Sequence, residues 1–192
     1  MIFRETRLRD AYIIELERLE DERGFFARTW CRNEFAAHGI NVEMVQASIS
    51  QNKRAGTVRG LHFAWPPSRE AKLVRCGRGK IHDVILDLRP DSTSFGMHFA
   101  IVLDSEQANA LFIPSGIAHG FQTLEDDCEV IYMMTEFYRP ELAAGVRFDD
   151  PAFAIDWPLP VSLIVERDRT YPDFDSVEHV RRYRLAEGKK SE

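Results

Sequence analysis

A histidine, an arginine and a lysine stand close together in residues 56–77, a run that otherwise predicts two short strands joined by a Pro-Pro turn. At a period of two, His62 shares one strand face with Gly60 and Ala64, and these small neighbours leave space beside the imidazole. Lys72 begins the second strand on a partly apolar face. Burial of its charge there costs free energy, so we expect the charge to take part in binding or chemistry. We therefore expect this run to carry the chemistry.

Acid–base chemistry without a metal fits these residue types. His62 is a natural general base near neutral pH, and it works better when a carboxylate holds its second nitrogen. Lys72 and Arg59 can stabilise an oxyanion, and a tyrosine on the opposite side can return a proton. The set fits removal of a proton beside a carbonyl group, through an enolate intermediate.

Metal binding is the competing hypothesis. The residues around His62 and His119 resemble the two motifs of the cupin superfamily, whose metal-binding members place two histidines two residues apart in the first motif. Ala64 occupies the second of those positions, and the Pro-Pro turn leaves the direction of Glu70 open. A first-row metal needs three or four nitrogen, oxygen or sulfur ligands, so we expect a jelly roll with no metal and no cofactor.

Composition and charge exclude several classes of partner. The chain has 192 residues, 44% of them hydrophobic and 29% charged, with a formal net charge of -6. This is globular composition, and its acidity argues against nucleic acid or an anionic membrane as the main partner. There is no apolar leader or bilayer-length run. Three cysteines without a C-x-x-C pair predict reduced thiols in a cytoplasmic protein.

Many short strands must position the candidate residues. Strands are expected near residues 1–20, 25–30, 42–49, 57–63, 72–76, 80–88, 97–103, 111–113, 117–123 and 128–137, and short helices near 33–38 and 105–110. Frequent turns between such strands predict an all-β sandwich or barrel. The chain becomes irregular after residue 148. We expect one domain over residues 1–185 and a polar tail over residues 186–192.

Several motifs over residues 10–170 resemble those of the dTDP-4-dehydrorhamnose 3,5-epimerase family. They are Arg59-Gly60-Leu61-His62-Phe63, Lys72-Leu73-Val74-Arg75, Asp83-Val84 with Asp87-Leu88-Arg89, Ile113-Pro114-Ser115-Gly116-Ile117-Ala118-His119-Gly120-Phe121, and Asp149-Asp150-Pro151 through Asp156-Trp157-Pro158. The resemblance implies a metal-free cupin jelly roll that forms a homodimer. It also implies an epimerase of deoxysugar and polysaccharide synthesis, which inverts C3, C5 or both in a nucleotide-linked 4-keto-6-deoxyhexose.

The resemblance also implies catalytic roles for four residues, His62, Asp168, Tyr132 and Lys72, and a substrate-binding role for Arg59 beside them. His62 resembles the general base and Asp168 its carboxylate partner, brought back by the C-terminal segment. Tyr132 resembles the general acid. Lys72 and Arg59 match the residues that hold the sugar and stabilise the enolate oxygen.

Five further residues match substrate-binding positions of the family. His119 matches a pocket residue, and Gln46 and Tyr138 match positions near the nucleotide base, where an aromatic ring can stack. Arg167 stands where many members have lysine. Arg23 matches a phosphate contact that the N-terminal arm of one subunit donates to the neighbouring subunit.

The spacing of Arg59 and His62 raises a conflict. The two residues have opposite parity on a regular strand, yet both are expected to face the pocket. A bulge or kink at Gly60 would resolve this, because glycine tolerates one. We therefore predict an irregularity at Gly60.

Four residues depart from the usual family pattern. Arg28 stands where glutamate is typical, Ser48 where asparagine is usual, Ala64 in place of glutamine and Ala143 in place of glutamate. By analogy, all four are ligand-side or subunit-edge positions. They leave open which nucleotide and sugar are bound, and whether one carbon or both are inverted.

Two other functions stay open, namely a related cupin keto-sugar isomerase and a sugar-nucleotide-binding cupin without catalysis. The site residues also have structural readings. His119 could cap the turn before it, Tyr132 could fill the core, Asp168 could lie in a solvated loop, and Arg23 could form a surface ion pair of little energetic value. The presence of His62, Tyr132 and Asp168 together favours the epimerase.

Overall fold

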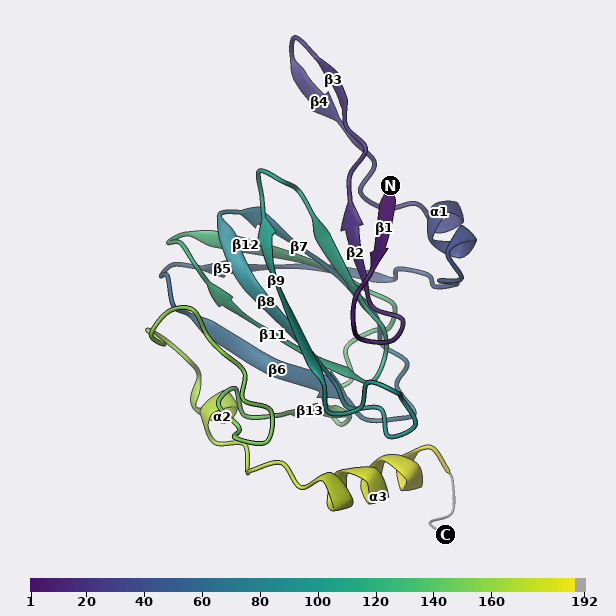
Figure 1. Ribbon diagram of the computed structural model, residues 1–192, viewed down its shortest axis with the longest axis vertical. Coiled ribbons are helices and arrows are strands. Elements are labelled where there is room, and N and C mark those ends of the chain that lie inside the picture. The colour runs from purple at the N-terminus through teal and green to yellow at the C-terminus, as the bar shows by residue number, and fades with distance from the viewer. Residues whose placement is uncertain (189–192) are drawn as a thin grey trace.

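The computed structural model describes residues 1–188 as a β-sandwich with short helices at its margins (Figure 1). The strands are β1 (Ile2–Glu5), β2 (Tyr12–Glu15), β3 (Leu19–Asp21), β4 (Gly24–Phe26), β5 (Gln46–Asn52), β6 (Val58–Ala64), β7 (Lys72–Arg78), β8 (Lys80–Asp87), β9 (His98–Asp104), β10 (Ala110–Ile113), β11 (Ile117–Thr123), β12 (Cys128–Met134) and β13 (Ala143–Gly145). The helices are α1 (Arg32–Ala37), α2 (Glu166–Arg169) and α3 (Ser176–Ala186).

Two antiparallel sheets form the sandwich. In the described part of the chain, one sheet has six strands in the order β1-β2-β10-β7-β12-β5, and the other has five in the order β13-β6-β11-β8-β9. From β9 to β13, each successive strand crosses to the opposite sheet. This arrangement confirms the all-β jelly roll that the sequence predicts.

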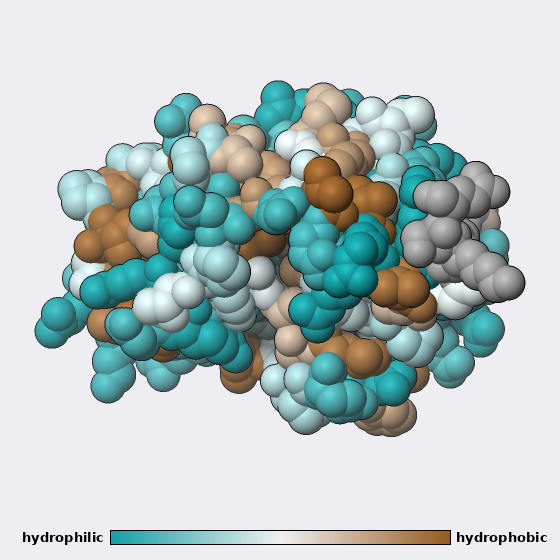
Figure 2. Space-filling view, turned by 90° about the horizontal axis from the view of Figure 1, so that it is seen from below, coloured by the Kyte–Doolittle hydropathy of each residue, from teal (hydrophilic) through white to brown (hydrophobic). Residues whose placement is uncertain are grey.

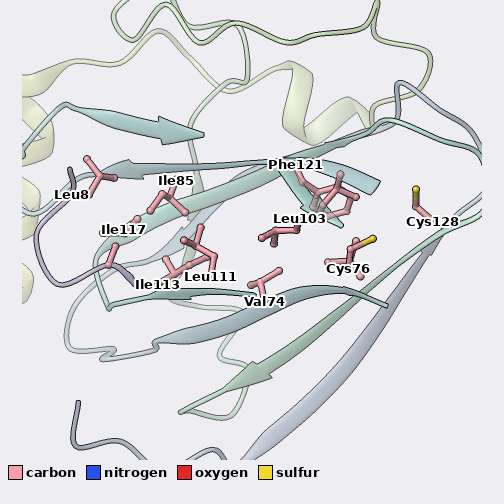
Figure 3. Packing of buried hydrophobic residues seen from close by; sticks show 13 residues of the cluster. Leu8, Val74, Cys76, Ile85, Leu103, Leu111, Ile113, Ile117, Phe121 and Cys128 are labelled. Atoms are coloured by element: carbon pink, nitrogen blue, oxygen red, sulfur yellow. The ribbon is translucent and has the colours of Figure 1, made fainter. Parts of the chain in front are cut away.

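An apolar core joins the inner faces of the two sheets (Figure 3). Val74 and Leu111 of the six-stranded sheet pack into one cluster with Ile85, Leu103 and Phe121 of the five-stranded sheet. Burial of these side chains is the main source of stability for such a sandwich. The same packing fixes how far apart the two sheets stand, and the site depends on that separation.

The strands that carry the candidate residues lie in both sheets. His62 on β6 is paired with His119 on β11 in the five-stranded sheet. In the six-stranded sheet, β12 pairs with β7 so that Tyr132 lies opposite Val74. Because side chains alternate along a strand, Lys72 projects from the same face as Val74 and Tyr132.

Two segments lie outside the sandwich. The β3–β4 hairpin stands away from the body (Figure 1) and exposes Leu19, Phe25 and Phe26 by 69%, 48% and 70%. After β13 the chain runs back beneath the five-stranded sheet, with α2 beside β6 and α3 along the lower margin (Figure 1). The face on the α3 side is largely hydrophilic, with hydrophobic residues in small separate patches (Figure 2).

Several predicted elements differ from the observed ones. The strands expected over residues 25–30 and 128–137 end at Phe26 and Met134. The strand expected over residues 1–20 is three strands. Residues 6–11 form a turn between β1 and β2, closed by the hydrogen bond from the Thr6 amide to the Ala11 carbonyl, and residues 16–18 separate β2 from β3. The strand expected over residues 42–49 begins later and continues to Asn52, in register with β12. Residues 105–108 form turns rather than a helix, and Ala110 already begins β10.

The segment after residue 148 is more ordered than expected, because it contains α2 and α3. Asp175 caps α3 by accepting hydrogen bonds from the amides of Val177 and Glu178 at 2.9 and 3.0 Å. The helix continues to Ala186, past the boundary expected at residue 185, and residues 189–192 of the expected tail lie outside the described residues. None of the helices in residues 1–188 is long and apolar enough to cross a membrane.

Candidate active site

Two adjoining cavities open between the sheets. The outer cavity, lined by Gln46 and Tyr138, has a volume of about 540 Å³. The inner cavity, lined by Arg59 and His119, has a volume of about 380 Å³. The residues that line both cavities are His62, Lys72, Tyr132 and Arg167. The cavities therefore form one continuous site, of a size common for small-molecule ligands.

His62 and Asp168 form a hydrogen-bonded pair across 106 residues of sequence. Nε2 of His62 donates to Oδ1 of Asp168 at 2.8 Å, and the Gly60 amide donates to Oδ2 at 3.0 Å. Burial would raise the pKa of Asp168, but the hydrogen bonds from His62 and Gly60, with that from Arg167, outweigh it and lower the pKa. The charged carboxylate therefore orients the imidazole and leaves Nδ1 to accept a proton.

A short parallel bridge brings Asp168 to β6. Thr57 pairs with Leu163, and the Val58 amide donates to the Leu163 carbonyl at 2.9 Å. Helix α2 begins just after Val165 and presents Asp168 to the middle of β6. Asp168 is only 1% exposed, so the solvated-loop reading of this residue is wrong.

The irregularity predicted at Gly60 is confirmed. His62 lies opposite His119 and Arg59 lies opposite Phe121, so β6 has one more residue than β11 between these two pairs. Gly60 has a φ of +101°, and a Cβ there would lie 2.6 Å from the carbonyl oxygen of His119. Glycine is therefore required at this position. As a consequence of the bulge, Arg59 and His62 both line the inner cavity.

Tyr132 faces the site from the six-stranded sheet. Its ring lies edge-on to that of His119, with centroids 5.9 Å apart. Burial raises the pKa of Tyr132 far above its usual value, and the charge of Asp83 raises it further against the opposing effect of Arg59. The phenol therefore keeps its proton near neutral pH and can act as an acid. The candidate base, His62, and this acid come from opposite sheets.

A second buried carboxylate holds His119. Nε2 of His119 lies 2.8 Å from Oδ1 of Asp83 on β8, and both side chains are buried. The reading of His119 as a turn cap is wrong, because the residue lies within β11 and bonds across to β8. Sequence motifs alone give Asp83 no role, although a carboxylate directly before the apolar run Val84-Ile85-Leu86 is a usable signal.

Glu70 points into the outer cavity and pairs with Lys72. Its Oε1 lies 2.9 Å from Nζ of Lys72, and each side chain is 16% exposed. The sequence leaves the direction of Glu70 open because of the preceding Pro-Pro turn. Its position two residues before Lys72 is the signal for a shared face.

The outer cavity contains the two residues expected near the nucleotide base. Oε1 of Gln46 accepts a hydrogen bond from the Tyr138 amide at 3.3 Å, and the Tyr138 ring is exposed. Three positions that depart from the family pattern, Ser48, Ala64 and Ala143, line the same cavity. Ala64 and Ala143 are paired across β6 and β13. Each of the three is smaller than the side chain usual in the family, and all three line the outer cavity rather than the inner one.

The fold places Arg167 and Arg23 very differently. Nη2 of Arg167 lies 3.0 Å from Nε2 of His62, and its Nε donates to Oδ1 of Asp168 at 3.1 Å. Arg23 lies at the turn of the β3–β4 hairpin, where its side chain is 89% exposed and paired with Asp21. Arg23 lines neither cavity of its own chain.

The histidines and carboxylates of the site bond to other protein side chains and do not form a metal-binding group. Within residues 1–188, no three or more histidine, cysteine, aspartate or glutamate side chains form a group that could hold a metal ion. Nε2 of His62 and Nε2 of His119 are bonded to Asp168 and Asp83, and Glu70 is paired with a lysine. The residues present therefore do not fit the cupin metal site.

Two sequence comparisons agree on one family. The family model for dTDP-4-dehydrorhamnose 3,5-epimerase matches residues 5–176. A curated dTDP-4-dehydrorhamnose 3,5-epimerase from Methanothermobacter thermautotrophicus is 43% identical over 172 residues, which cover 88% of this chain and 92% of that protein.

Solved structures show the same likeness. A crystal structure of dTDP-4-dehydrorhamnose 3,5-epimerase from Bacillus anthracis, with TDP and PPi bound, superposes with a TM-score of 0.87 at 35% identity, over 90% of this chain and 99% of that one. ChmJ, a 3'-monoepimerase from Streptomyces bikiniensis in complex with dTDP-quinovose, gives a TM-score of 0.82 at 27% identity, over 91% and 89% of the two chains. With fold, family model and curated relative in agreement, this chain belongs to the dTDP-4-dehydrorhamnose 3,5-epimerase family and is an isomerase-class enzyme.

Proposed function

We propose that this protein inverts C3 and C5 of a dTDP-linked 4-keto-6-deoxyhexose, a step in deoxysugar synthesis of the dTDP-rhamnose kind. The observation that carries the proposal is the His62–Asp168 pair, which shares the inner cavity with Tyr132 of the opposite sheet. Inversion at a carbon requires that a proton leaves one face and returns to the other. A base and an acid on opposing sheets supply that requirement.

The proposed reaction begins when Nδ1 of His62 takes a proton from a carbon beside the C4 carbonyl. The electron pair of the broken C–H bond moves towards the carbonyl oxygen and gives an enolate, which Lys72 and Arg59 stabilise. Tyr132 donates its proton to the opposite face of the same carbon, and the carbonyl re-forms. Proton exchange with water then restores the neutral imidazole and the phenol, and the cycle repeats at the second carbon.

We assign the nucleotide to the outer cavity. The exposed ring of Tyr138 offers a stacking surface, and Gln46 lies beside it. Arg167 lies where the two cavities meet and offers a charge to the diphosphate. The names of the curated relatives support dTDP as the nucleotide.

We further propose a homodimer in which the N-terminal hairpin of one subunit completes the site of the other. An isolated two-stranded hairpin is marginally stable in water, and this one exposes Leu19, Phe25 and Phe26. Docking on a second copy would bury these side chains and bring Arg23 to the neighbouring diphosphate. Arg28, which follows the hairpin, lies outside both cavities of its own chain and pairs with a glutamate.

The cytoplasm is the proposed site of action. Cys31, Cys76 and Cys128 are free thiols. Burial raises the pKa of Cys76 to about 12, which keeps this thiol unreactive. Reduced thiols and a nucleotide-linked substrate both fit a reducing compartment.

Proton NMR in D₂O with dTDP-4-keto-6-deoxyglucose and its UDP and GDP counterparts tests the proposed reaction. We expect loss of the C3 and C5 proton signals, fastest with the dTDP sugar. Loss of one signal would make the protein a single-carbon epimerase. A rearranged keto-sugar product would identify a related isomerase, and binding without exchange a non-catalytic cupin.

His62→Ala is the control for that experiment. The variant is expected to lose proton exchange while it keeps TDP binding, because His62 acts on the sugar rather than on the nucleotide. Exchange at the wild-type rate in this variant would remove His62 as the base.

A further inference from the structure

The outer cavity contains a carboxylate where an anionic ligand is expected. Among the described residues that line this cavity, Glu70 is the sole carboxylate, and it is 16% exposed. The carboxylate of the inner cavity, Asp168, is engaged by His62, Arg167 and the Gly60 amide. A half-buried negative charge close to a nucleotide diphosphate weakens binding of that diphosphate. The presence of Glu70 therefore implies a second effect that offsets the weaker binding of the diphosphate.

The turn that carries Glu70 is fixed by its surroundings. Glu136 accepts hydrogen bonds from the hydroxyl of Ser68 at 2.8 Å and from the amide of Arg69 at 2.9 Å. The Ser68 hydroxyl in turn accepts a hydrogen bond from the Glu70 amide at 3.2 Å. These contacts hold the backbone of the turn and leave the Glu70 carboxylate free to act on its neighbour.

That neighbour is Lys72, whose ammonium lies at the boundary of the two cavities. A lysine side chain has several rotatable bonds and much conformational freedom, so an unanchored ammonium would occupy many positions. An ammonium has three N–H donors. The ion pair with Glu70, whose Oε1 lies 2.9 Å from Nζ, holds the ammonium while N–H donors remain for the oxygen that becomes negative during the reaction.

We propose that Glu70 is a positioning residue, which anchors the Lys72 ammonium for the enolate oxygen and at the same time weakens the hold of the site on the diphosphate. This inference rests on the proposed function for the role of Lys72, but its charge effect on nucleotide binding does not. The two effects have opposite signs for a variant that loses the carboxylate. Turnover falls, and the nucleotide binds more tightly.

Three substitutions of Glu70 distinguish the effect of its negative charge from the effect of its shape and reach. Glu70→Gln keeps the shape and removes the charge, Glu70→Ala removes both, and Glu70→Asp keeps the charge but shortens the reach to Lys72. Glu136→Gln is the control for a disturbed turn. Glu106→Gln, at an exposed residue in the β9–β10 connection, is the control for loss of one negative charge elsewhere.

The measurements are the dissociation constant of TDP by titration calorimetry, and kcat and KM from the NMR exchange assay. For Glu70→Gln and Glu70→Ala we expect TDP to bind about threefold to tenfold more tightly, an effect that shrinks as salt is added. We expect kcat to fall about tenfold to a hundredfold for Glu70→Ala, and less for the isosteric Glu70→Gln. Glu70→Asp is expected to lower kcat without tighter TDP binding, and Glu106→Gln to behave as wild type.

Several outcomes would overturn the inference. Weaker TDP binding together with lower kcat in Glu70→Gln, as expected for Glu136→Gln, would show that the residue only supports the turn. Unchanged kcat in Glu70→Ala would remove the positioning role. If the wild-type protein itself exchanges no sugar protons, the proposed function fails, and TDP binding by the variants still decides whether Glu70 opposes the diphosphate.

Discussion

At the scale of single residues, the site contains titratable groups whose environments move their pKa values apart. Hydrogen bonds lower the pKa of Asp168 below its usual value, whereas burial raises that of Tyr132. Such divergence is the usual basis for separate acid and base roles on one fold. Asp168 stays charged to hold His62, and Tyr132 stays protonated until an anion forms beside it.

Tyr132→Phe should separate proton removal from inversion. His62 can still take a proton and return a deuteron from D₂O to the same face, but no acid serves the other face. We expect product formation to fall by about a hundredfold or more while exchange at the acidic carbon continues. NMR exchange and product analysis on the same sample measure both. Equal loss of exchange and product would show that Tyr132 is needed for proton removal itself.

At the scale of elements, the bulge in β6 allows one strand to present two polar side chains, Arg59 and His62, to one cavity. Gly60 makes this possible, because its backbone approaches β11 too closely for a side chain. A regular strand at this point would turn either Arg59 or His62 away from the substrate.

Gly60→Ala should unfold more easily than Gly96→Ala. Both glycines have positive φ, of +101° and +77°, but a Cβ at Gly96 would meet nothing within 4 Å. We expect a loss of about 1 kcal/mol in the free energy of unfolding for Gly96→Ala and roughly 3 kcal/mol for Gly60→Ala. Urea denaturation compares them, and equal losses would mean that the approach to β11 is easily relaxed.

The β8–β9 connection depends on a buried carboxylate with a clear pH signature. Asp87 accepts hydrogen bonds from Arg89 at 2.9 and 2.7 Å and from Ser92 and Ser94 at 2.6 Å. Burial raises the pKa of Asp87, but these hydrogen bonds outweigh it and hold the pKa below 3.8. Asp87 therefore contributes its full stabilisation at pH values above 3.8, the ordinary pKa of an aspartate. This contribution is lost as the pH falls through the lower pKa that Asp87 has in the folded protein.

Asp87→Asn should therefore cost stability in a pH-dependent manner. We expect a loss of about 2–4 kcal/mol in the free energy of unfolding at pH 7, because Arg89 loses its buried partner. The difference from wild type should narrow as the pH falls below 3.8 and wild-type Asp87 becomes protonated through its lowered pKa. Urea titrations at pH 7 and at a series of acidic pH values test this, and a constant difference would contradict the assigned direction of the pKa shift.

How far the sequence predicts this structure depends on how far apart the interacting residues lie along the chain. The all-β class follows from the many short strands between turns, the jelly roll from the motifs that resemble the family, and the bulge at Gly60 from the spacing of Arg59 and His62. Helix α2 is only four residues long and depends on contacts with β6, so no local pattern predicts it. The direction of Glu70 depends on Glu136, which lies far along the chain. Helix α3 does have a local signal, the cap at Asp175, which the surrounding irregular composition obscures.

At the scale of the whole molecule, the exposed hairpin and the position of Arg23 on it both favour the proposed dimer. Arg23 is the arginine that the family resemblance places at the diphosphate, and in a single chain it lies outside the cavities. A twofold dimer with exchanged hairpins would supply both sites at once.

Subunit complementation tests the exchange directly. Arg23→Ala and His62→Ala homodimers are each expected to have little activity. In a mixed dimer, one site receives both Arg23 and His62 from different subunits, so co-expression should restore about a quarter of wild-type activity if subunits assort at random. No recovery in mixed dimers verified by mass spectrometry would show that each chain uses its own Arg23.

The path of the C-terminal segment also imposes an order in time. Every strand of the sandwich precedes Asp168 in the sequence, including those that carry His62, Lys72 and Tyr132. Leu163, which bridges to Thr57, also follows every strand. A chain emerging from the ribosome can therefore build its sheets and enclose a cavity while the imidazole still lacks its partner. The His62–Asp168 pair can therefore form only late in synthesis, after the sandwich that contains the cavity.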